Sequence, residues 1–311
     1  MEDLYVKKSV IDSFLITLCK MVKILMFGEK ENPLIRVYCC GVWLILPFDH
    51  ALPKIKLNFP KYDTALPELC AFLKYNNIND IKIIDVGANI GDTINQIIAR
   101  VSSVSALCIE PSKVFFSLLI ENTKNFKDVE YLNSFISNQD KTYLKIEEKR
   151  GTASSSITES SQNSINCFTL DYLVKNNFSK FKDINILKID TDGWDIHVLE
   201  GARNVMASTK PFIFFEFSPT HLCQNVTTNT TKILSLFKFY GYFNFILYDG
   251  EGFLLGLFDL NKNLDFNTIL NTIYNYGCNR SSYYCDILTA HENKKEILIQ
   301  FYENEKVRLN A

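Results

Sequence analysis

The sequence lacks the features that mark several common functional classes. Its 311 residues carry 33 Lys and Arg against 35 Asp and Glu, so there is no excess of positive charge to hold a polynucleotide. Its nine cysteines include no C-x-x-C pair, and an odd number without framework spacing favours a reducing compartment. We therefore expect a cytoplasmic protein without a nucleic acid partner.

A continuous apolar run of about 18 residues, which a membrane-spanning helix needs, is also missing. Residues 10–27 are strongly apolar, but Asp12, Lys20 and Lys23 interrupt them, and no small-residue cleavage site follows. Their pattern predicts a helix with a broad apolar face. This helix either packs against its own or a neighbouring subunit, as in a homo-oligomer, or makes peripheral contact with a membrane, its lysines near anionic headgroups.

What the sequence does contain is a regular alternation of strand and helix patterns. Strands are expected at 81–86, 104–109, 129–135, 184–189 and 212–217, and helices at 92–100, 112–124, 196–207 and 232–240. A hairpin (242–248 and 253–258) and a last strand (285–288) follow. The alternation predicts an α/β fold in which helices cover both faces of a parallel sheet. A ligand site is expected at the carboxyl ends of the strands.

Two segments depart from this alternation. Residues 1–60 are expected to form an N-terminal appendage, made of the apolar helix and one or two strands within 34–47, ahead of a main domain at 61–311. The Ser/Thr-rich residues 151–164 have no periodicity and predict a mobile loop. This loop is either a lid over the ligand or an insertion.

The first strand of the main domain leads into a glycine turn and a helix start, where backbone N–H groups face a ligand. Asn89 and Asp92 stand where a G-x-G-x-x-G dinucleotide motif beginning at Gly87 has its second and third glycines. An acidic helix start repels phosphate, and the carboxylate of Asp85 at the strand end suits an amino group. Glu110, which ends the next strand, is placed to accept hydrogen bonds from both hydroxyls of a ribose. A ligand with a ribose, an amino group and no phosphate is S-adenosylmethionine, which we expect as the cofactor.

Several motifs occur in the order found in FkbM-type methyltransferases, which the chain resembles over roughly residues 80 to 220. They are Asp85-Val-Gly-Ala-Asn-Ile-Gly-Asp92, Glu110-Pro-Ser112, Thr169-Leu-Asp171, Leu187-Lys-Ile-Asp-Thr-Asp-Gly-Trp-Asp195, Val198-Leu-Glu-Gly-Ala202 and Phe214-Phe-Glu216. The resemblance implies a Rossmann-like methyltransferase sheet of seven strands, S-adenosylmethionine, and usually O-methylation of a sugar or natural-product hydroxyl. The match departs at Asp192 and Asp195, where the family more often has Glu.

The resemblance also implies roles for individual residues. The methionine part of the cofactor would be held by the turn and helix start, that is by Asp85, Gly87, Ala88, Asn89, Gly91 and Asp92, and the ribose by Glu110. Ser134 and Phe135, at the end of the third strand, are expected beside the adenine. Ser112 is expected to cap the following helix.

Methyl transfer from a sulfonium requires a base for the proton of the acceptor hydroxyl. Asp190 and Glu216 end neighbouring strands and are the first candidates, with His221 just beyond Glu216 as a third. Asp190, Asp192 and Asp195 together also suit a divalent metal, although carboxylates at a helix start are favoured by the helix dipole alone. His50, which has no evident partner, and His197, which lies within a helix, are expected to be structural.

These observations predict an S-adenosylmethionine-dependent O-methyltransferase that acts on a hydroxyl of a small polar acceptor, such as a sugar of a surface glycan. Two alternatives stay open. One is a non-catalytic, cofactor-binding scaffold subunit, and the other is a metal-dependent hydrolase built on the Asp190, Asp192 and Asp195 cluster. An NAD-linked oxidoreductase ranks last, because Asn89 and Asp92 replace two glycines of the dinucleotide motif.

Overall fold

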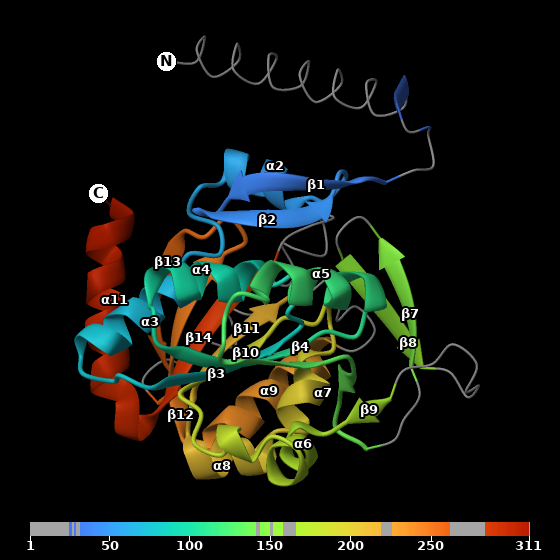
Figure 1. Cartoon of the computed structure of the whole chain (residues 1–311). Coiled ribbons are helices and arrows are strands. Elements are labelled where there is room, and N and C mark those ends of the chain that lie inside the picture. Colours follow the sequence, from blue (N-terminus) through green and yellow to red (C-terminus); the bar gives the residue numbers. More distant parts are fainter. Residues whose placement is uncertain are drawn as a thin grey trace.

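The computed structural model describes residues 25, 26, 28, 32–140, 144–149, 152–157, 166–218, 226–261 and 284–310, with the backbone alone at 144–149, 152–157, 226–230 and 310. A central sheet of eight strands has the order β13-β12-β14-β11-β10-β3-β4-β5 (Figure 1). In chain order these strands are β3 (Ile81–Val86), β4 (Val104–Ile109), β5 (Val129–Leu132), β10 (Ile186–Ile189), β11 (Phe212–Phe217), β12 (Tyr242–Asp249), β13 (Leu254–Asp259) and β14 (Cys285–His291).

The strand directions confirm the predicted fold class. Five adjacent strands run parallel, in the order β5, β4, β3, β10 and β11. The strand order reverses between β3 and β10, because β4 and β5 lie on one side of β3 and the later strands lie on the other. Strand β14 lies antiparallel between β11 and β12. The prediction of seven strands was wrong by one, because the second arm of the expected hairpin, β13, joins the sheet as an edge strand beside β12.

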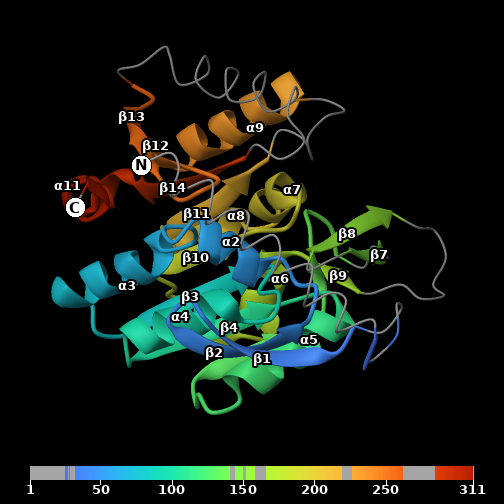
Figure 2. The same cartoon turned by 90° about the horizontal axis from the view of Figure 1, so that it is seen from above.

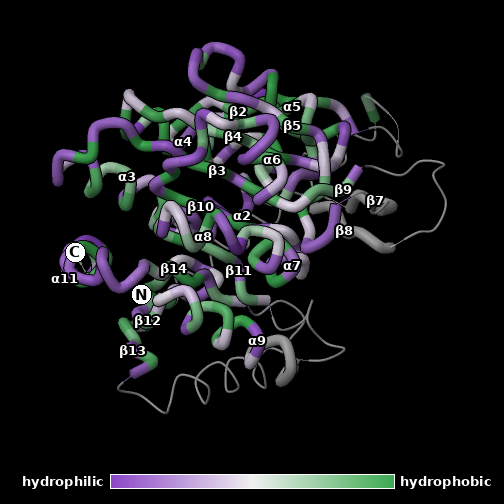
Figure 3. The backbone as a smooth tube through the Cα atoms, turned by 90° about the horizontal axis from the view of Figure 1, so that it is seen from below, coloured by the Kyte–Doolittle hydropathy of each residue, from purple (hydrophilic) through white to green (hydrophobic). Residues whose placement is uncertain are grey.

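Helices cover both faces of the sheet (Figure 1). Helices α3 (Ala65–Tyr75), α4 (Asp92–Arg100), α5 (Lys113–Thr123) and α11 (Lys295–Asn310) lie on one face, and α6 (Leu170–Asn176), α7 (Asp195–Glu200), α8 (Arg203–Thr209) and α9 (Val226–Phe239) on the other. Hydrophobic and hydrophilic residues follow one another closely along covering helices such as α3 and α11 (Figure 3), as expected for helices with one buried face. Two short 3₁₀ helices, η1 (Ser179–Phe181) and η2 (Glu292–Lys294), also lie within the described residues.

The prediction of a single helix at 196–207 was wrong, because two separate helices, α7 and α8, form there. Helix α8 has its own N-terminal cap from a distant residue: the carboxylate of Asp171 accepts hydrogen bonds from the backbone N–H groups of Asn204 (2.9 Å) and Val205 (2.9 Å). Such a cap satisfies donors that a helix start leaves without partners, so it favours a new helix at this point. A cap supplied from another helix leaves no local signal in the sequence.

The prediction of a loop at 151–164 was wrong in part. Thr152–Ile157 form strand β8, which pairs antiparallel with β7 (Leu144–Lys149) in a hairpin apart from the central sheet. The hairpin forms its own ladder of backbone hydrogen bonds, which requires no apolar periodicity. The third strand of the central sheet is shorter than expected, because the chain turns at β6 (Phe135–Ile136) to pair with β9 (Cys167–Phe168).

A further layer lies over α4 and α5 (Figures 1 and 2). It consists of the hairpin β1 (Leu34–Cys39) and β2 (Val42–Pro47), which confirms the predicted strands, and of helix α2 (Leu52–Asn58). Its buried side chains Leu44, Leu46 and Leu52 pack against Phe115 and Leu118 of α5. The apolar helix expected at 10–27 lies outside the described residues apart from Leu25 and Met26, and no helix within the described residues is long and apolar enough to cross a membrane.

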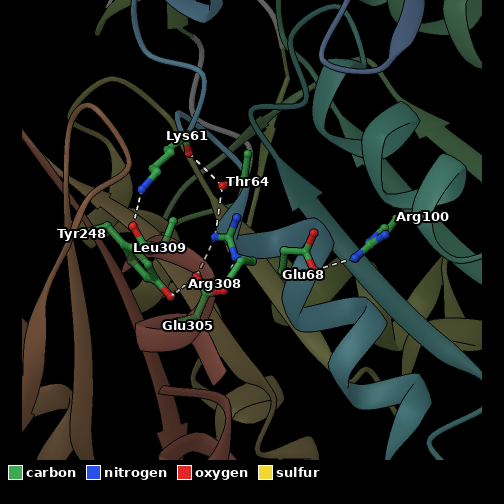
Figure 4. Close-up of polar contacts among 8 residues, drawn as sticks. All are labelled: Lys61, Thr64, Glu68, Arg100, Tyr248, Glu305, Arg308 and Leu309. Atoms are coloured by element: carbon green, nitrogen blue, oxygen red, sulfur yellow. Dashed lines mark hydrogen bonds and ion pairs between the residues drawn. The ribbon is translucent and has the colours of Figure 1, made fainter. Parts of the chain in front are cut away.

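The C-terminal helix α11 is bound to the segment 61–64 by a polar cluster (Figure 4). The buried carboxylate of Glu305 receives two hydrogen bonds from Arg308 (2.6 and 2.8 Å) and one from the Tyr248 hydroxyl (3.2 Å). Arg308 also donates to the Thr64 hydroxyl (3.2 Å), and Lys61 donates to the backbone carbonyl of Leu309. The segment 61–64 is therefore held in place by α11.

Candidate functional site

A cavity of about 250 Å³ lies at the carboxyl ends of the central parallel strands. Its wall includes many of the predicted site residues, namely Gly87, Asn89, Asp92, Glu110, Ser134, Phe135, Asp190 and Glu216. These residues come from the ends of β3, β4, β5, β10 and β11 and from the turns that follow. The site therefore lies where an open α/β sheet is expected to bind its ligand, beside the point where the strand order reverses.

The glycine turn after β3 is held tightly against neighbouring strands. The backbone N–H groups of Gly87 and Ala88 both donate to the carbonyl of Ile109 on β4 (2.9 and 3.0 Å). Gly87 has a left-handed backbone (φ +83°), and a Cβ atom there would lie 1.7 Å from the carbonyl oxygen of Asp190. Only glycine fits this close approach of the first strand end to the fourth.

Glu110 joins the glycine turn to the next helix. Its Oε2 accepts from the backbone N–H of Asn89 (2.9 Å) and its Oε1 from that of Ser112 (2.8 Å). Burial raises the pKa of Glu110 to about 7, against the lowering effect of these hydrogen bonds. The expected cap is confirmed, since the Ser112 hydroxyl accepts from the backbone N–H of Phe115 (3.2 Å) in α5.

The groups in this half of the cavity fit a ribose and an adenine. Each carboxylate oxygen has two lone pairs, so Glu110 keeps acceptor capacity toward the cavity after its two backbone hydrogen bonds. Pro111, Phe115 and Phe135 form an apolar wall nearby. The Ser134 hydroxyl donates to the backbone carbonyl of Asn166 (2.7 Å), so its proton is used within the protein.

Three residues expected around the cofactor, Asp85, Ala88 and Gly91, are not among the residues that line the cavity. Asp85 is 1% exposed and forms an ion pair with Lys188 of β10 (3.0 Å). Burial disfavours the charge of Lys188, but the attraction of Asp85, Asp190 and Asp63 raises its pKa well above the usual value. Lys188, unlike Asp85, lines the cavity.

The other half of the cavity carries a row of carboxylates on adjacent strands. Asp190 and Glu216 follow the paired residues Ile189 and Phe215, and Glu216 is itself paired with Asp286 of β14. Burial, followed by the repulsion of Asp190, raises the pKa values of Glu216 and Asp286 well above their usual range. The Asp190 side chain is 46% exposed, so it is the open member of the row.

Asp192 and Asp195 differ in their surroundings. Asp192 lines the cavity, and burial raises its pKa to about 7. Asp195 is buried at the start of α7 and accepts from the backbone N–H groups of Thr191 (3.4 Å) and Gly193 (3.2 Å). Among the described residues, no group of three or more His, Cys, Asp and Glu side chains is placed to hold a metal ion.

Several cavity residues are absent from the sequence-based prediction. They are His50, Tyr62, Asp63, Lys188, Tyr284 and Asp286. His50 was expected to be structural and without partners, but it lies at the cavity, where its Nδ1 accepts from the backbone N–H of Leu52 (3.3 Å). His221 lies outside the described residues. His197 and His291 are not among the residues that line the cavity; His197 lies beside Trp194, which does line it, and His291 lies beside Tyr242.

Residues 85–243 match the family model of the methyltransferase FkbM domain. No curated protein matches the chain. Solved structures with a similar fold include precorrin-6y C5,15-methyltransferase from Geobacter metallireducens, at 11% identity and a TM-score of 0.35, over 69% of this chain and 81% of that one. A second is the plantazolicin methyltransferase BpumL in complex with SAH, at 10% identity and a TM-score of 0.38, over 77% and 90%. A third is the ribosomal protein L11 methylase of Lactobacillus delbrueckii, at 8% identity and a TM-score of 0.37, over 73% and 77%.

The family model spans just over half of the 311 residues, and the assignment to a family rests on it alone. The matched range includes the glycine turn, Glu110, Asp190 and Glu216, which the structure brings to one cavity. This chain therefore belongs to the FkbM methyltransferase family.

Proposed function

We propose that the chain transfers a methyl group from S-adenosylmethionine to a hydroxyl oxygen of a small polar acceptor, with sugars of surface glycans as the first class to test. One observation carries this proposal. Gly87, Asn89 and Glu110 on one side, and Asp190 and Glu216 on the other, open into a single cavity. A donor half and an acid–base half are thus close enough to serve one reaction.

The acidic side chains of the cavity favour a cationic cofactor at a pH at which they are ionised. Seven acidic side chains are among its described lining residues, namely Asp63, Asp92, Glu110, Asp190, Asp192, Glu216 and Asp286. The one lysine among these lining residues, Lys188, forms ion pairs with Asp85 and Asp190. S-adenosylmethionine supplies, when bound, a positively charged sulfonium whose methyl group is already activated for displacement. Asp92 and Glu110 would bind the methionine and ribose parts, and Phe135 would pack against the adenine.

The acceptor half supplies groups for a hydroxyl-bearing molecule. Asp190 is the most exposed of the three aligned carboxylates, so we assign it the role of accepting the proton of the acceptor hydroxyl. Glu216 and Asp286, whose pKa values are raised by burial, would hydrogen-bond other hydroxyls of the acceptor. Tyr62 and Tyr284 also line the cavity, and the Tyr284 hydroxyl donates to the backbone carbonyl of Gly250 (3.2 Å).

The proposal includes a division of the chain into an appendage at 1–60 and a methyltransferase domain at 61–311. Its support is that β1, β2 and α2 form a layer of their own, which packs against Ile90 and α5 in a hydrophobic cluster outside the two clusters of the central sheet. In this proposal the appendage forms part of the cavity wall. His50, Leu52 and Ile55 line the cavity and would close it on the side of α5.

Calorimetry with S-adenosylmethionine and S-adenosylhomocysteine tests the cofactor half. We expect both to bind the wild type, and Glu110→Ala to weaken binding by about tenfold or more, because it removes a buried acceptor for the ribose. Glu130→Ala is the matched control, since Glu130 lies on the neighbouring strand β5 outside the cavity lining. A wild type that binds neither ligand would refute the proposal.

Transfer is tested with methyl-labelled cofactor and the glycan, lipid-linked and small-molecule fractions of the source cell. We expect one fraction to take the label, and Asp190→Asn to abolish labelling while cofactor binding is retained. Binding without transfer to any fraction would instead favour the scaffold alternative. Labelling that persists in Asp190→Asn would remove this residue from its role as the base.

A further inference from the structure

Lys188 is a charged residue in a strand that is otherwise fully apolar and buried. It is 3% exposed, and its neighbours Ile186, Leu187 and Ile189 are each 0% exposed. A buried ammonium loses its hydration, and it is tolerated only where charged or polar partners replace the water. Its position in the middle of the sheet therefore needs an explanation beyond packing.

The three hydrogen atoms of the ammonium match three acceptors. Lys188 Nζ lies 3.0 Å from Asp85 Oδ1, 3.3 Å from the Gly87 carbonyl oxygen and 3.3 Å from Asp190 Oδ2. The strand register produces this arrangement. Lys188 is paired with Asp85 across β3 and β10, while Asp190 and Gly87 each lie two residues further along, on the same face of the sheet.

The two carboxylates depend on this lysine to different degrees. Asp85 is 1% exposed and its second oxygen, Oδ2, has no hydrogen-bond partner among the described residues, so Lys188 is its main support. Asp190 opens to the cavity, and Gly87 belongs to the turn that lines it. The ammonium of Lys188 thus joins Asp85, which serves as a buried anchor, to Gly87 and Asp190 of the site.

We propose that Lys188 is a positioning residue, which fixes the carbonyl of the cofactor turn and the carboxylate of Asp190 to the buried anchor Asp85. This inference rests on the proposed function. It means that one side chain, in addition to the backbone pairing of β3 with β10, links the cofactor half of the cavity to the acid–base half. A methyltransferase needs the two halves in register, because small displacements of a reacting group from alignment slow a displacement reaction strongly.

A purely structural role for Lys188, as the counter-charge of Asp85, predicts different behaviour in a double variant. Lys188→Met leaves Asp85 buried without its cation, so both roles predict lower stability for it. Asp85→Asn/Lys188→Met removes both charges, so both roles predict that stability is regained. Binding separates the two roles, because the double variant still lacks the donor to Gly87 and Asp190.

The test measures thermal stability and affinity for S-adenosylhomocysteine in the full chain for four proteins: wild type, Lys188→Met, Lys188→Arg and Asp85→Asn/Lys188→Met. Lys82→Met is the matched control, since Lys82 also pairs with an aspartate, Asp183 (2.6 Å), but at the surface and away from the cavity. We expect the double variant to regain stability yet bind about tenfold more weakly than wild type or worse. Lys188→Arg, which keeps the charge and several donors, should recover part of the affinity.

Wild-type affinity in the double variant would overturn the inference and leave the proposed function standing. If Lys188→Met does not fold, the double variant alone decides the question. A wild type that does not bind S-adenosylhomocysteine overturns the proposed function and, with it, this role for Lys188. With the acceptor fraction that takes the label, the rate of methyl transfer at saturating cofactor should also fall in the double variant. This measurement separates a defect in alignment from a defect in affinity.

Discussion

At the scale of single residues, the cavity concentrates carboxylates whose protonation is set by burial. The pKa of Glu110 is raised to about 7 and that of Asp92 to about 6, in both cases chiefly by burial. Both groups therefore gain their negative charge between weakly acidic and neutral pH. Their charge is what a cationic cofactor requires.

We predict that affinity for S-adenosylmethionine rises as the pH increases from about 5 to about 8, across the pKa values of about 6 for Asp92 and about 7 for Glu110. Calorimetry across this range measures it. The rise should be smaller for S-adenosylhomocysteine, which lacks the sulfonium charge, and Glu110→Gln should flatten it. An affinity for S-adenosylmethionine that is independent of pH would contradict the role of these carboxylates.

The stability of the unliganded protein should change in the opposite direction. A carboxyl group whose folded-state pKa is raised adds to stability below its unfolded pKa, and this contribution is lost as the pH rises through the folded value. For Glu110 the window extends from its ordinary pKa of 4.5 to about 7. Thermal unfolding in the same buffers therefore gives an independent reading of the same groups.

Residue identity in the sequence was enough to find the motif carboxylates but not the groups around them. Asp92, Glu110, Asp190 and Glu216 end strands or begin a helix, so the alternating pattern places them at one edge of the sheet. Lys188 was overlooked because a lysine inside an apolar strand gives no sign of the strand that will lie beside it. Its partner Asp85 was expected to face the ligand for the same reason.

At the scale of elements, the C-terminal helix α11 fixes a part of the cavity wall from a distance. Tyr62 and Asp63 line the cavity, and the residues on either side of them, Lys61 and Thr64, are the ones bound by Leu309 and Arg308 (Figure 4). Asp63 has a left-handed backbone (φ 51°), which non-glycine residues adopt at a cost. The contacts of α11 hold the segment in this conformation.

We predict that Arg308→Ala lowers the free energy of unfolding by about 3 to 5 kcal/mol, because Glu305, 0% exposed, loses its cation. Lys306→Ala is the matched control, because its ion pair with Glu303 lies on the surface, where such pairs contribute little to stability. Urea denaturation of both variants compares them. Equal effects would show that the buried cluster contributes no more than a surface pair.

The elements themselves were largely predictable, because periodicity and glycine or proline boundaries are local properties. The strands Ile81–Val86, Val104–Ile109 and Phe212–Phe217 and the helix Asp92–Arg100 have their predicted bounds. The failures occurred where distant residues decide the outcome. Asp171 caps α8 from another helix, and β13 extends the sheet because β12 offers it an open edge.

At the scale of the whole molecule, the layer of β1, β2 and α2 is part of the site. Leu46 is 0% exposed in the cluster that this layer forms with α5, and Leu52 and Ile55 line the cavity. The sequence predicted these strands but not their place, since packing of a hairpin onto a helix is not encoded in local periodicity.

We predict that Leu46→Ala costs about 2 to 5 kcal/mol of stability and also weakens binding of S-adenosylhomocysteine, because the wall of the cavity loosens with the layer. Leu57→Ala is the control within the same layer, at a leucine that is 56% exposed, and it should change both quantities little. Denaturation and calorimetry on the two variants measure the effects. A destabilised Leu46→Ala that binds normally would separate the layer from the site.

Strand β14 follows β11 and β12 in the chain but lies between them in the sheet. Until β14 has left the ribosome, β11 and β12 each have an edge without its native neighbour, and unpaired edges promote association between chains. Tyr284 and Asp286 arrive with the same strand, so the cavity is incomplete until then. When the chain folds during synthesis, β14 must therefore insert between two strands made before it, and a cofactor can stabilise the cavity only after this insertion.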